Sequence, residues 1–268
     1  MNSIFRFRIA IQTVKEHWRT TVIIALLFVL MTSMYSGMFP QFEEALIEMM
    51  SSGFGDSFNF LPHADQMATY VGFLTLELYQ IFWLLILAIM IGFIAASSIT
   101  KEIEAKTIDL LMSNPVSRKQ IVFEKFIGLI PMVLVINFCT MLTVIGITML
   151  INQNLDFGNL FMLHMVSISY FLAIISIGIL ISVLIDEKMK ASIIMIAILF
   201  AMFFINSISL MTPNLEYIGS FTIFHYFDTF NVLKSGDVDV AGVFVFIALI
   251  TVCLTLSLVY FEHKDISS

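Results

Sequence analysis

Charged residues are absent from six long stretches of the chain, which consist mostly of Leu, Ile, Val, Phe, Met and Ala. Each stretch has at least 20 residues, and about 20 helical residues cross the roughly 30 Å of hydrocarbon in a bilayer. Backbone amides in lipid need internal partners and no barrel-like alternation is present, so helices are expected rather than strands. The pattern predicts an all-α polytopic membrane protein with six transmembrane helices, at residues 20–39, 78–99, 126–151, 157–185, 191–215 and 240–261.

Residues 1–19 precede the first apolar stretch and have a helical pattern of their own. Basic side chains at Arg8, Lys15 and Arg19 share a face that lies apart from the apolar one. This pattern predicts an N-terminal interfacial helix with its cations near anionic lipid, the alternative being a polar extension of the first span. Its apolar stripe, spaced by three and four residues, consists of Ile4, Phe7, Ile11, Val14 and Trp18.

Two connections on the opposite side of the membrane are long. Residues 40–77 form an outer loop with helical spacing up to Met50, and this loop is too short to fold as a separate domain. Residues 212–239 are rich in aromatic and apolar side chains but are interrupted by Pro, Gly and Asp. This composition predicts an outer re-entrant segment. The whole chain therefore reads as a single transmembrane domain, 1–268.

Basic residues gather on one side of the predicted membrane. Twelve of the 13 lie in segments 1–19, 100–125, 186–190 and 262–268, whereas Lys234 alone lies on the other side. The first side has 9 acids and a net charge of +3, and the other has 11 acids and a net charge of −10. Basic segments stay in the cytoplasm, so both termini are predicted to be cytoplasmic and the protein to reside in the cytoplasmic (plasma) membrane. No basic patch typical of nucleic-acid binding is present.

The central segment, residues 100–125, is the most highly charged part of the chain. Residues 101–126 alone contain nine of the 33 charged side chains. Ile103, Thr107 and Leu111 fall on one helical face, and Pro115 then ends the helix because the residue before a proline is disfavoured in helical conformation. The segment is thus predicted to be a short amphipathic helix, a proline turn and a return to the membrane. Such a short, rigid cytoplasmic element is suited to being bound by another protein.

This segment, KEIEAKTIDLLMSNPVSRKQIVFEKF, resembles the region between the second and third spans in permeases of the type-2 ATP-binding-cassette (ABC) exporter family. The chain departs from that family in having Lys106 where many members carry Gly. The resemblance extends to the six spans, the long first outer loop and the aromatic outer segment. Its motif is carried by Glu104, Thr107, Leu110, Leu111, Pro115, Val116, Ser117, Arg118, Lys125 and Phe126.

The resemblance implies that segment 100–125 contains a cytoplasmic coupling helix, which docks on a separate ATPase. An ordinary basic loop is the alternative. It further implies a second coupling loop at Asp186, Glu187 and Lys188, two cytoplasmic ABC ATPase subunits that bind ATP and Mg, and a second permease copy or a homologous permease. The implied coupling residues of the first segment are Glu102, Glu104, Thr107, Leu110, Leu111, Pro115, Val116, Ser117 and Arg118.

The sequence carries no motif for catalysis or metal binding. No glycine is followed by lysine, so the phosphate-binding loop of nucleotide-hydrolysing proteins is absent, and the chain is predicted to be neither an enzyme nor the holder of a cofactor. Its five histidines are scattered. Cys139 and Cys253 fall within spans, where cysteine serves as a small packing residue, so no metal site is expected.

Three polar residues within spans, Asn137, His164 and Asn206, are candidates for a transport pathway. The alternative for each is a hydrogen bond between helices. Together with the six spans, the resemblance implies the membrane permease subunit of an ATP-driven ABC exporter, whose substrate is unidentified. The alternatives are a non-transporting scaffold or regulatory protein and a secondary transporter, although a secondary transporter is expected to carry acids within its spans.

Overall fold

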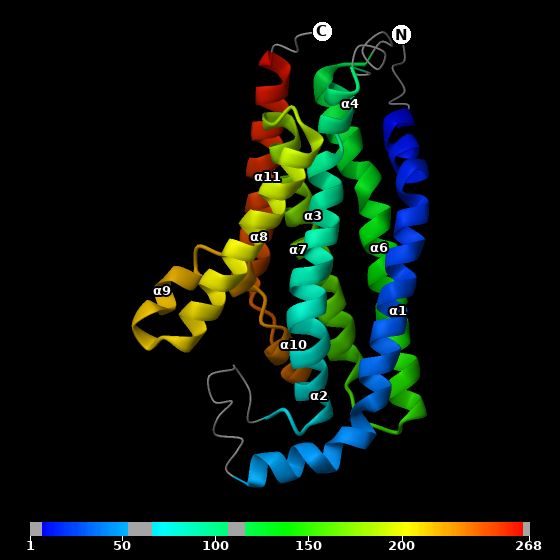
Figure 1. Cartoon of the computed structure of the whole chain (residues 1–268), viewed down its shortest axis with the longest axis vertical. Coiled ribbons are helices and arrows are strands. Elements are labelled where there is room, and N and C mark those ends of the chain that lie inside the picture. The colour runs from blue at the N-terminus through cyan, green and yellow to red at the C-terminus, as the bar shows by residue number, and fades with distance from the viewer. Residues whose placement is uncertain (1–6, 53–65, 107–115, 265–268) are drawn as a thin grey trace.

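A computed structural model describes residues 7–52, 66–106 and 116–264. Its secondary structure is helical, with no strand among the described residues (Figure 1). Six helices are long and apolar enough to cross a membrane, which confirms the predicted all-α, six-span architecture. They are α1 (Arg8–Ser51), a composite second helix (Tyr70–Glu104), α6 (Arg118–Leu150), α7 (Phe157–Leu184), α8 (Lys188–Met211) and α11 (Val240–His263).

The second span is built from four consecutive pieces. It starts with α2 (Tyr70–Phe73), continues as the π-helix η3 (Leu74–Leu87) and α3 (Ala88–Ser97), and ends with α4 (Thr100–Glu104). A turn at residues 98–99 separates α3 from α4. π-helical geometry is rare and usually limited to a single turn, so a 14-residue stretch gives this span an unusual course through the core.

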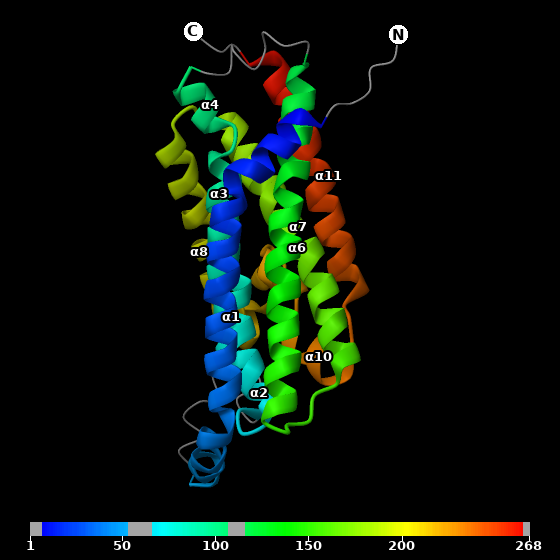
Figure 2. The ribbon, with the colours of Figure 1, turned by 90° about the vertical axis from the view of Figure 1, so that its right-hand side faces the viewer.

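The first span and the predicted interfacial helix are one continuous helix, α1. No glycine or proline interrupts residues 8–36. The hydroxyls of Thr13 and Thr21 donate to the carbonyl oxygens four residues earlier, at 2.8 and 2.9 Å, and such bonds bend helices. Figure 2 shows the N-terminal part of α1 inclined to the rest.

Beyond Pro40, α1 continues as a helix to Ser51, so the predicted outer loop 40–77 begins with helical residues. A proline inside a helix removes one backbone hydrogen bond and kinks the helix. In Figure 1 the light-blue end of α1 turns across the lower end of the bundle, in agreement with a kink near Pro40.

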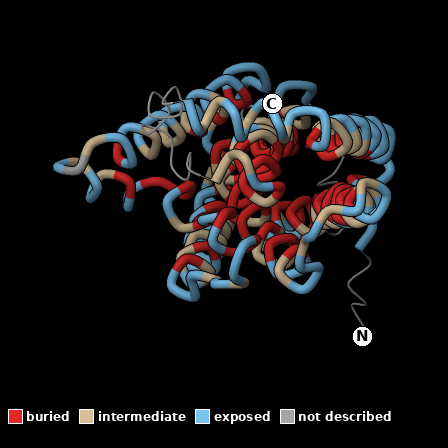
Figure 3. Tube along the Cα trace, turned by 90° about the horizontal axis from the view of Figure 1, so that it is seen from below, coloured by how far each residue is buried: buried red, intermediate tan, exposed pale blue. Residues whose placement is uncertain are grey.

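The second and fourth spans form the centre of the bundle. In their most apolar windows 67% of residues are buried, compared with 17% in α8 and 22% in α11. Helix α7 packs against α3, α6 and α11, while α1 lies along α6 and α8 lies against α3. Figure 3 shows buried residues concentrated in the middle and exposed residues around the rim, the arrangement expected when the rim faces lipid.

Trp83 of η3 is fully buried and lies at the centre of a group of aromatic side chains. The rings of Phe28, Phe171 and His164 meet it nearly perpendicularly, with centroid distances of 5.9, 5.4 and 5.1 Å. Each such edge-to-face pair contributes about 0.5–1.5 kcal/mol beyond area burial. Trp83 therefore fixes how α1, η3 and α7 sit together.

The segment between α8 and α11 consists of short helical turns rather than an extended loop. They are η4 (Pro213–Leu215), α9 (Glu216–Gly219), η5 (Ile223–Tyr226) and α10 (Thr229–Ser235). Phe224 and Phe227 are buried with ring centroids 6.1 and 5.7 Å from that of Tyr170 in α7. In Figure 1, α9 projects from the side of the bundle and α10 lies at its lower end. The re-entrant course predicted for this segment stays a prediction.

Helices α3 and α7 approach closely at Gly178. A Cβ atom there would lie 2.6 Å from Cβ of Ala95 and 3.2 Å from the carbonyl oxygen of Gly92. We expect Gly178→Leu to lower the midpoint temperature of unfolding of the detergent-solubilised protein, because overpacking costs about 1–3 kcal/mol.

Gly146→Leu is the matched control. Gly146 lies in the membrane-crossing part of α6, and a Cβ atom there has no neighbour within 4 Å. The control variant is expected to unfold at the wild-type temperature. Equal stability of both variants would contradict the close α3–α7 contact.

Candidate functional site

Helix α4 starts beside Ser182 of α7, whose hydroxyl oxygen accepts hydrogen bonds from the backbone amides at the start of α4. The Ser182 hydroxyl oxygen accepts hydrogen bonds from the amides of Ile99 at 2.8 Å and Thr100 at 3.0 Å. The Thr100 hydroxyl lies 2.9 Å from the same oxygen. Amides at the start of a helix have no helical partner and need another acceptor. Ser182 supplies that acceptor and fixes the point at which α4 leaves α3.

Helix α4 ends against the first residue of α8. A carboxylate oxygen of Glu104 accepts a hydrogen bond from the backbone amide of Lys188 at 2.7 Å. The chain then turns at Lys106, whose φ of 55° lies in the left-handed region that favours glycine. Glycine adopts this conformation without strain, which explains why it suits the end of α4 and is common at this position in the family that the segment resembles. The bond also brings together Glu104 and Lys188, which belong to the two predicted coupling elements.

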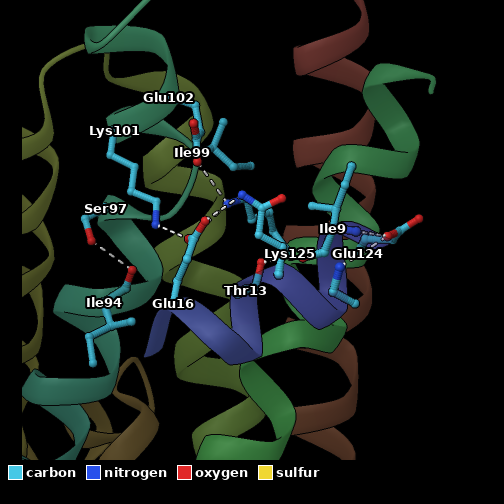
Figure 4. Close-up of polar contacts among 12 residues, drawn as sticks. Ile9, Thr13, Glu16, Ile94, Ser97, Ile99, Lys101, Glu102, Glu124 and Lys125 are labelled. Carbon is cyan, nitrogen blue, oxygen red and sulfur yellow. Dashed lines mark hydrogen bonds and ion pairs between the residues drawn. The ribbon is translucent and has the colours of Figure 1, made fainter. Parts of the chain in front are cut away.

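A chain of ion pairs joins α4 to α1 and α6 (Figure 4). Lys101 of α4 lies 2.6 Å from a carboxylate oxygen of Glu16 in α1. Lys125 of α6 lies 3.2 Å from Glu102 of α4 and 3.9 Å from Glu16, and its side chain is only 3% exposed. Removing one member of a buried ion pair typically costs about 3–5 kcal/mol. Both carboxylates therefore hold Lys125 in place.

Glu124, the neighbour of Lys125, anchors the start of α1. Its side chain is fully buried, and one carboxylate oxygen accepts the backbone amides of Ile9 at 2.8 Å and Ala10 at 3.2 Å. The other oxygen accepts from the side-chain amide of Gln120 at 2.6 Å. The positive end of a helix dipole favours a carboxylate at this position. Glu124 thus fixes the first turn of α1 on α6.

The start of α6 is joined to the end of α11. Ser117 caps α6 by accepting from the backbone amide of Gln120 at 3.2 Å. The guanidinium of Arg118 donates to the carbonyl oxygens of Phe261, at 3.2 Å, and Lys264. Two predicted coupling residues, Ser117 and Arg118, therefore have partners within the described chain.

Lys264 extends this connection to the loop between α7 and α8. Its ammonium group lies 2.6 Å from a carboxylate oxygen of Asp186 and donates to the carbonyl of Val183 at 2.6 Å. Glu187, the next residue of the loop, pairs with Lys190 at 2.5 Å, and both side chains are well exposed. The loop is thus held at one end of the bundle, together with α4 and both described chain ends (Figures 1 and 2).

The predicted coupling residues are only partly placed by the structure. Val116 is half-buried and packs against the hydrophobic core. The role of the described residues in binding an ATPase stays a prediction. Four further predicted residues lie outside the described part of the chain, namely Thr107, Leu110, Leu111 and Pro115.

The sequence patterns assigned no role to Glu16, Lys101, Glu124 and Ser182, and Lys125 entered only as part of the family motif. Four of these five residues are charged and lie within a few residues of an uncharged run. A charge at such an edge is partly desolvated and needs a partner, and this is the signal that was available. Ser182 gave no comparable signal, because serine is common inside membrane helices.

Asn137 and His164 are brought together in the buried core. The Asn137 side-chain oxygen lies 2.9 Å from His164 Nδ1, and its amide donates to the His164 carbonyl at 3.2 Å. Tyr79 of η3 reaches His164 Nε2 at 3.1 Å. Helix-to-helix hydrogen bonds, the alternative considered for these residues, are therefore present. A pathway role for them stays a prediction.

Asn206 lies apart from that pair, on α8. Its side-chain oxygen accepts from the hydroxyl of Thr222, at 3.4 Å, in the turn before η5. Among the residues that the structure describes, no three or more His, Cys, Asp or Glu side chains come close enough to hold a metal ion.

We expect Glu124→Gln to loosen the start of α1. A neutral amide oxygen accepts the hydrogen bonds from Ile9 and Ala10 more weakly than a carboxylate oxygen does. Hydrogen bonds to charged groups contribute about 1.5–3 kcal/mol, compared with about 0.5–1.5 kcal/mol for neutral pairs, so hydrogen exchange at these amides is expected to accelerate about fivefold or more.

Glu262→Gln is the control for this substitution. Glu262 pairs with Lys119 at 2.8 Å, but the two side chains are 47% and 53% exposed. Water screens an exposed pair, which therefore contributes little to stability, so exchange at the start of α1 is expected to stay at the wild-type rate. Equal exchange in wild type and Glu124→Gln would show that Glu124 does not anchor α1.

Comparison with known proteins identifies the class of this bundle. Residues 10–266 match the family model described as ABC-2 family transporter protein, which covers nearly all of the 268 residues. No curated protein matches the sequence. The chain therefore belongs to the ABC-2 family of transporter proteins, as a multi-pass membrane permease subunit of an ABC transporter.

Proposed function

We propose that this permease is the membrane subunit of an ATP-driven exporter and that a separate ATPase acts on α4 together with the α7–α8 loop. The observation that supports this most directly is the hydrogen bond between Glu104 and the amide of Lys188, which links the two elements directly. A partner that moves one of them moves the other. The chain's lack of a phosphate-binding loop assigns ATP and Mg to that partner.

The contacts of α4 give a route for force into the membrane. Ser182 joins α4 to α7, Lys101 joins it to α1 through Glu16, and Glu102 joins it to α6 through Lys125. Discrete contacts between packed helices transmit rigid-body movement, because a packed core does not deform continuously. Displacement of α4 would thus be carried into three spans at once.

The proposed assembly contains two ATPases and two permeases, the second permease being a copy of this chain or a homologous one. The exporter's pathway would lie between the permeases, since the centre of a single chain is filled by side chains such as Trp83, Tyr79 and Phe171. Nucleotide binding would close the ATPases and bring the two α4 helices together. Helices with few buried residues, α8 and α11, remain for contact with lipid or the second permease.

The end of the bundle that carries α4 is proposed to be cytoplasmic in the plasma membrane. Both described chain ends lie there (Figure 1), and 12 of the 13 basic residues belong to segments at that side. Basic segments remain in the cytoplasm during insertion.

A reporter enzyme tests this orientation. We expect a reporter fused after Lys234, in α10, to be active outside the cell, and one fused after Ser268 to be active inside. Alkaline phosphatase and a cytoplasmic fluorescent protein are suitable reporters for the two sides. The reverse pattern would refute the cytoplasmic placement of α4.

Purification of the tagged chain from its native membranes tests the function itself. The expected product is a complex with a nucleotide-hydrolysing subunit, in which ATP and vanadate change hydrogen exchange at α4 and at Lys188. Glu104→Ala removes the acceptor of the Lys188 amide. Since this bond is exposed and water competes for both partners, the nucleotide-dependent change at Lys188 should fall severalfold while ATP hydrolysis persists.

Glu216→Ala is the matched control, because Glu216 is an exposed acid in α9, away from α4. It is expected to leave the nucleotide response intact. A complex without an ATPase, or a chain whose exchange ignores nucleotide, would favour the scaffold alternative over the exporter.

A further inference from the structure

Residues 8–19 of α1 present three different faces. Ile9, Ala10 and Thr13 form a buried face against the rest of the bundle. Close contact with α6 is shown at Gly128, where a Cβ atom would lie 2.7 Å from Cβ of Thr13. This side of the helix is fully used by packing, so any additional function belongs to the two exposed faces.

The first exposed face is apolar. Ile11, Val14 and Trp18 follow one another at spacings of four and three residues and are 55%, 36% and 53% exposed. The same exposed apolar surface continues along α1 into the uncharged run at Val22 and Leu26. Because it merges with a surface that belongs in hydrocarbon, this face belongs against lipid rather than in the cytosol.

The second exposed face is cationic. Arg8, Lys15 and Arg19 share one side of the helix, next to the apolar face, and all three are exposed. Within the described part of the chain no ion pair engages them. The guanidinium of Arg19 lies 5.6 Å from the ring centre of Trp18, a pairing suited to the boundary between headgroups and hydrocarbon.

Acidic residues do not neutralise this cationic face. Glu16 is the one acid between residues 8 and 22, and its carboxylate is held by Lys101 and Lys125 toward α4 and α6. Glu124 holds the start of the helix through the amides of Ile9 and Ala10. These contacts prevent the helix from rolling about its axis, so its apolar and cationic faces keep fixed directions.

We propose that residues 8–19 form a binding surface for anionic phospholipids, with Arg8, Lys15 and Arg19 on the phosphate groups and the Ile11–Val14–Trp18 face on the adjoining acyl chains. Lysine and arginine near an anionic leaflet each favour it by a factor on the order of fivefold. An anionic phospholipid has acyl chains that match the apolar face and a phosphate group that matches the adjacent row of cations. The proposal rests on the geometry of α1 and is independent of the proposed transport.

Trp18 supplies a native fluorescent probe for this surface. The chain has two tryptophans, and the other, Trp83, is fully buried in the bundle. The full chain is reconstituted into phosphatidylcholine vesicles that contain a minor fraction of phosphatidylglycerol with brominated acyl chains. Matched vesicles contain the same fraction of brominated phosphatidylcholine instead. Bromine quenches tryptophan only at short range, so quenching reports which lipid lies next to Trp18.

We expect brominated phosphatidylglycerol to quench Trp18 several-fold more than brominated phosphatidylcholine, because each of three basic residues favours the anionic lipid. Trp18→Phe is the control that leaves only Trp83, and its residual quenching is expected to be the same in both vesicles. The triple variant Arg8→Gln, Lys15→Gln and Arg19→Gln should retain Trp18 quenching but lose the preference. None of these substitutions touches the buried face of the helix.

Three outcomes would overturn the proposal. Equal quenching by the two lipids in the wild type would make this face a general membrane anchor. Absence of quenching by either lipid would show that protein, such as an ATPase or a second copy of the chain, covers it. An unchanged preference in the triple variant would place the anionic lipid elsewhere on the surface.

Discussion

The hydroxyl of Ser182 satisfies the two backbone amides that the break between α3 and α4 leaves without helical partners. An unsatisfied buried amide costs about 1–3 kcal/mol, so the break is tolerated only where such an acceptor is within reach. The Ser182 hydroxyl is close enough to these amides because α3 and α7 approach each other closely at Gly178. The direction in which α4 leaves the membrane is therefore determined by packing inside the bundle, and the charged end of the molecule is arranged around that direction.

Two adjacent residues of α6 give that end its rigidity. Glu124 turns toward the start of α1 and Lys125 toward Glu102 and Glu16, so one helical turn holds both neighbouring elements. Buried charges of this kind are stable only while each keeps its partners. A movement of α4 that left α1 and α6 behind would break the contacts of a nearly buried cation. Concerted movement preserves them, and this is the physical reason to expect α1, α4 and α6 to shift as a unit.

The sequence predicted the six spans because lipid imposes a requirement on every residue of a span, and the uncharged runs record it directly. It offered an extension of the first span through residues 1–19 only as the alternative, since the polar first turns of α1 (Arg8–Ser51) depend on a distant acceptor, Glu124. Contacts such as Glu16 with Lys101 likewise join residues 85 positions apart, and no local pattern specifies them. Lys106 is intermediate between the spans, which the sequence predicted, and the long-range contacts, which it did not. The resemblance marked the position as unusual, and its left-handed backbone explains why.

The three faces of residues 8–19 connect the bilayer surface to the candidate coupling end through a single helix. Its outer faces carry Trp18 and the exposed cations, its buried face is fixed on α6, and Glu16 reaches Lys101 of α4. Because Glu124 and Glu16 hold the helix on different sides, rotation about its own axis would break one set of contacts or the other. With residues 8–19 bound to lipid as proposed, a change in how deeply the helix sits in the headgroup region would tilt or shift α1, α4 and α6 together. The position of α4 relative to the membrane surface would then depend on the exposed side of α1 as well as on the packing of α3 on α7.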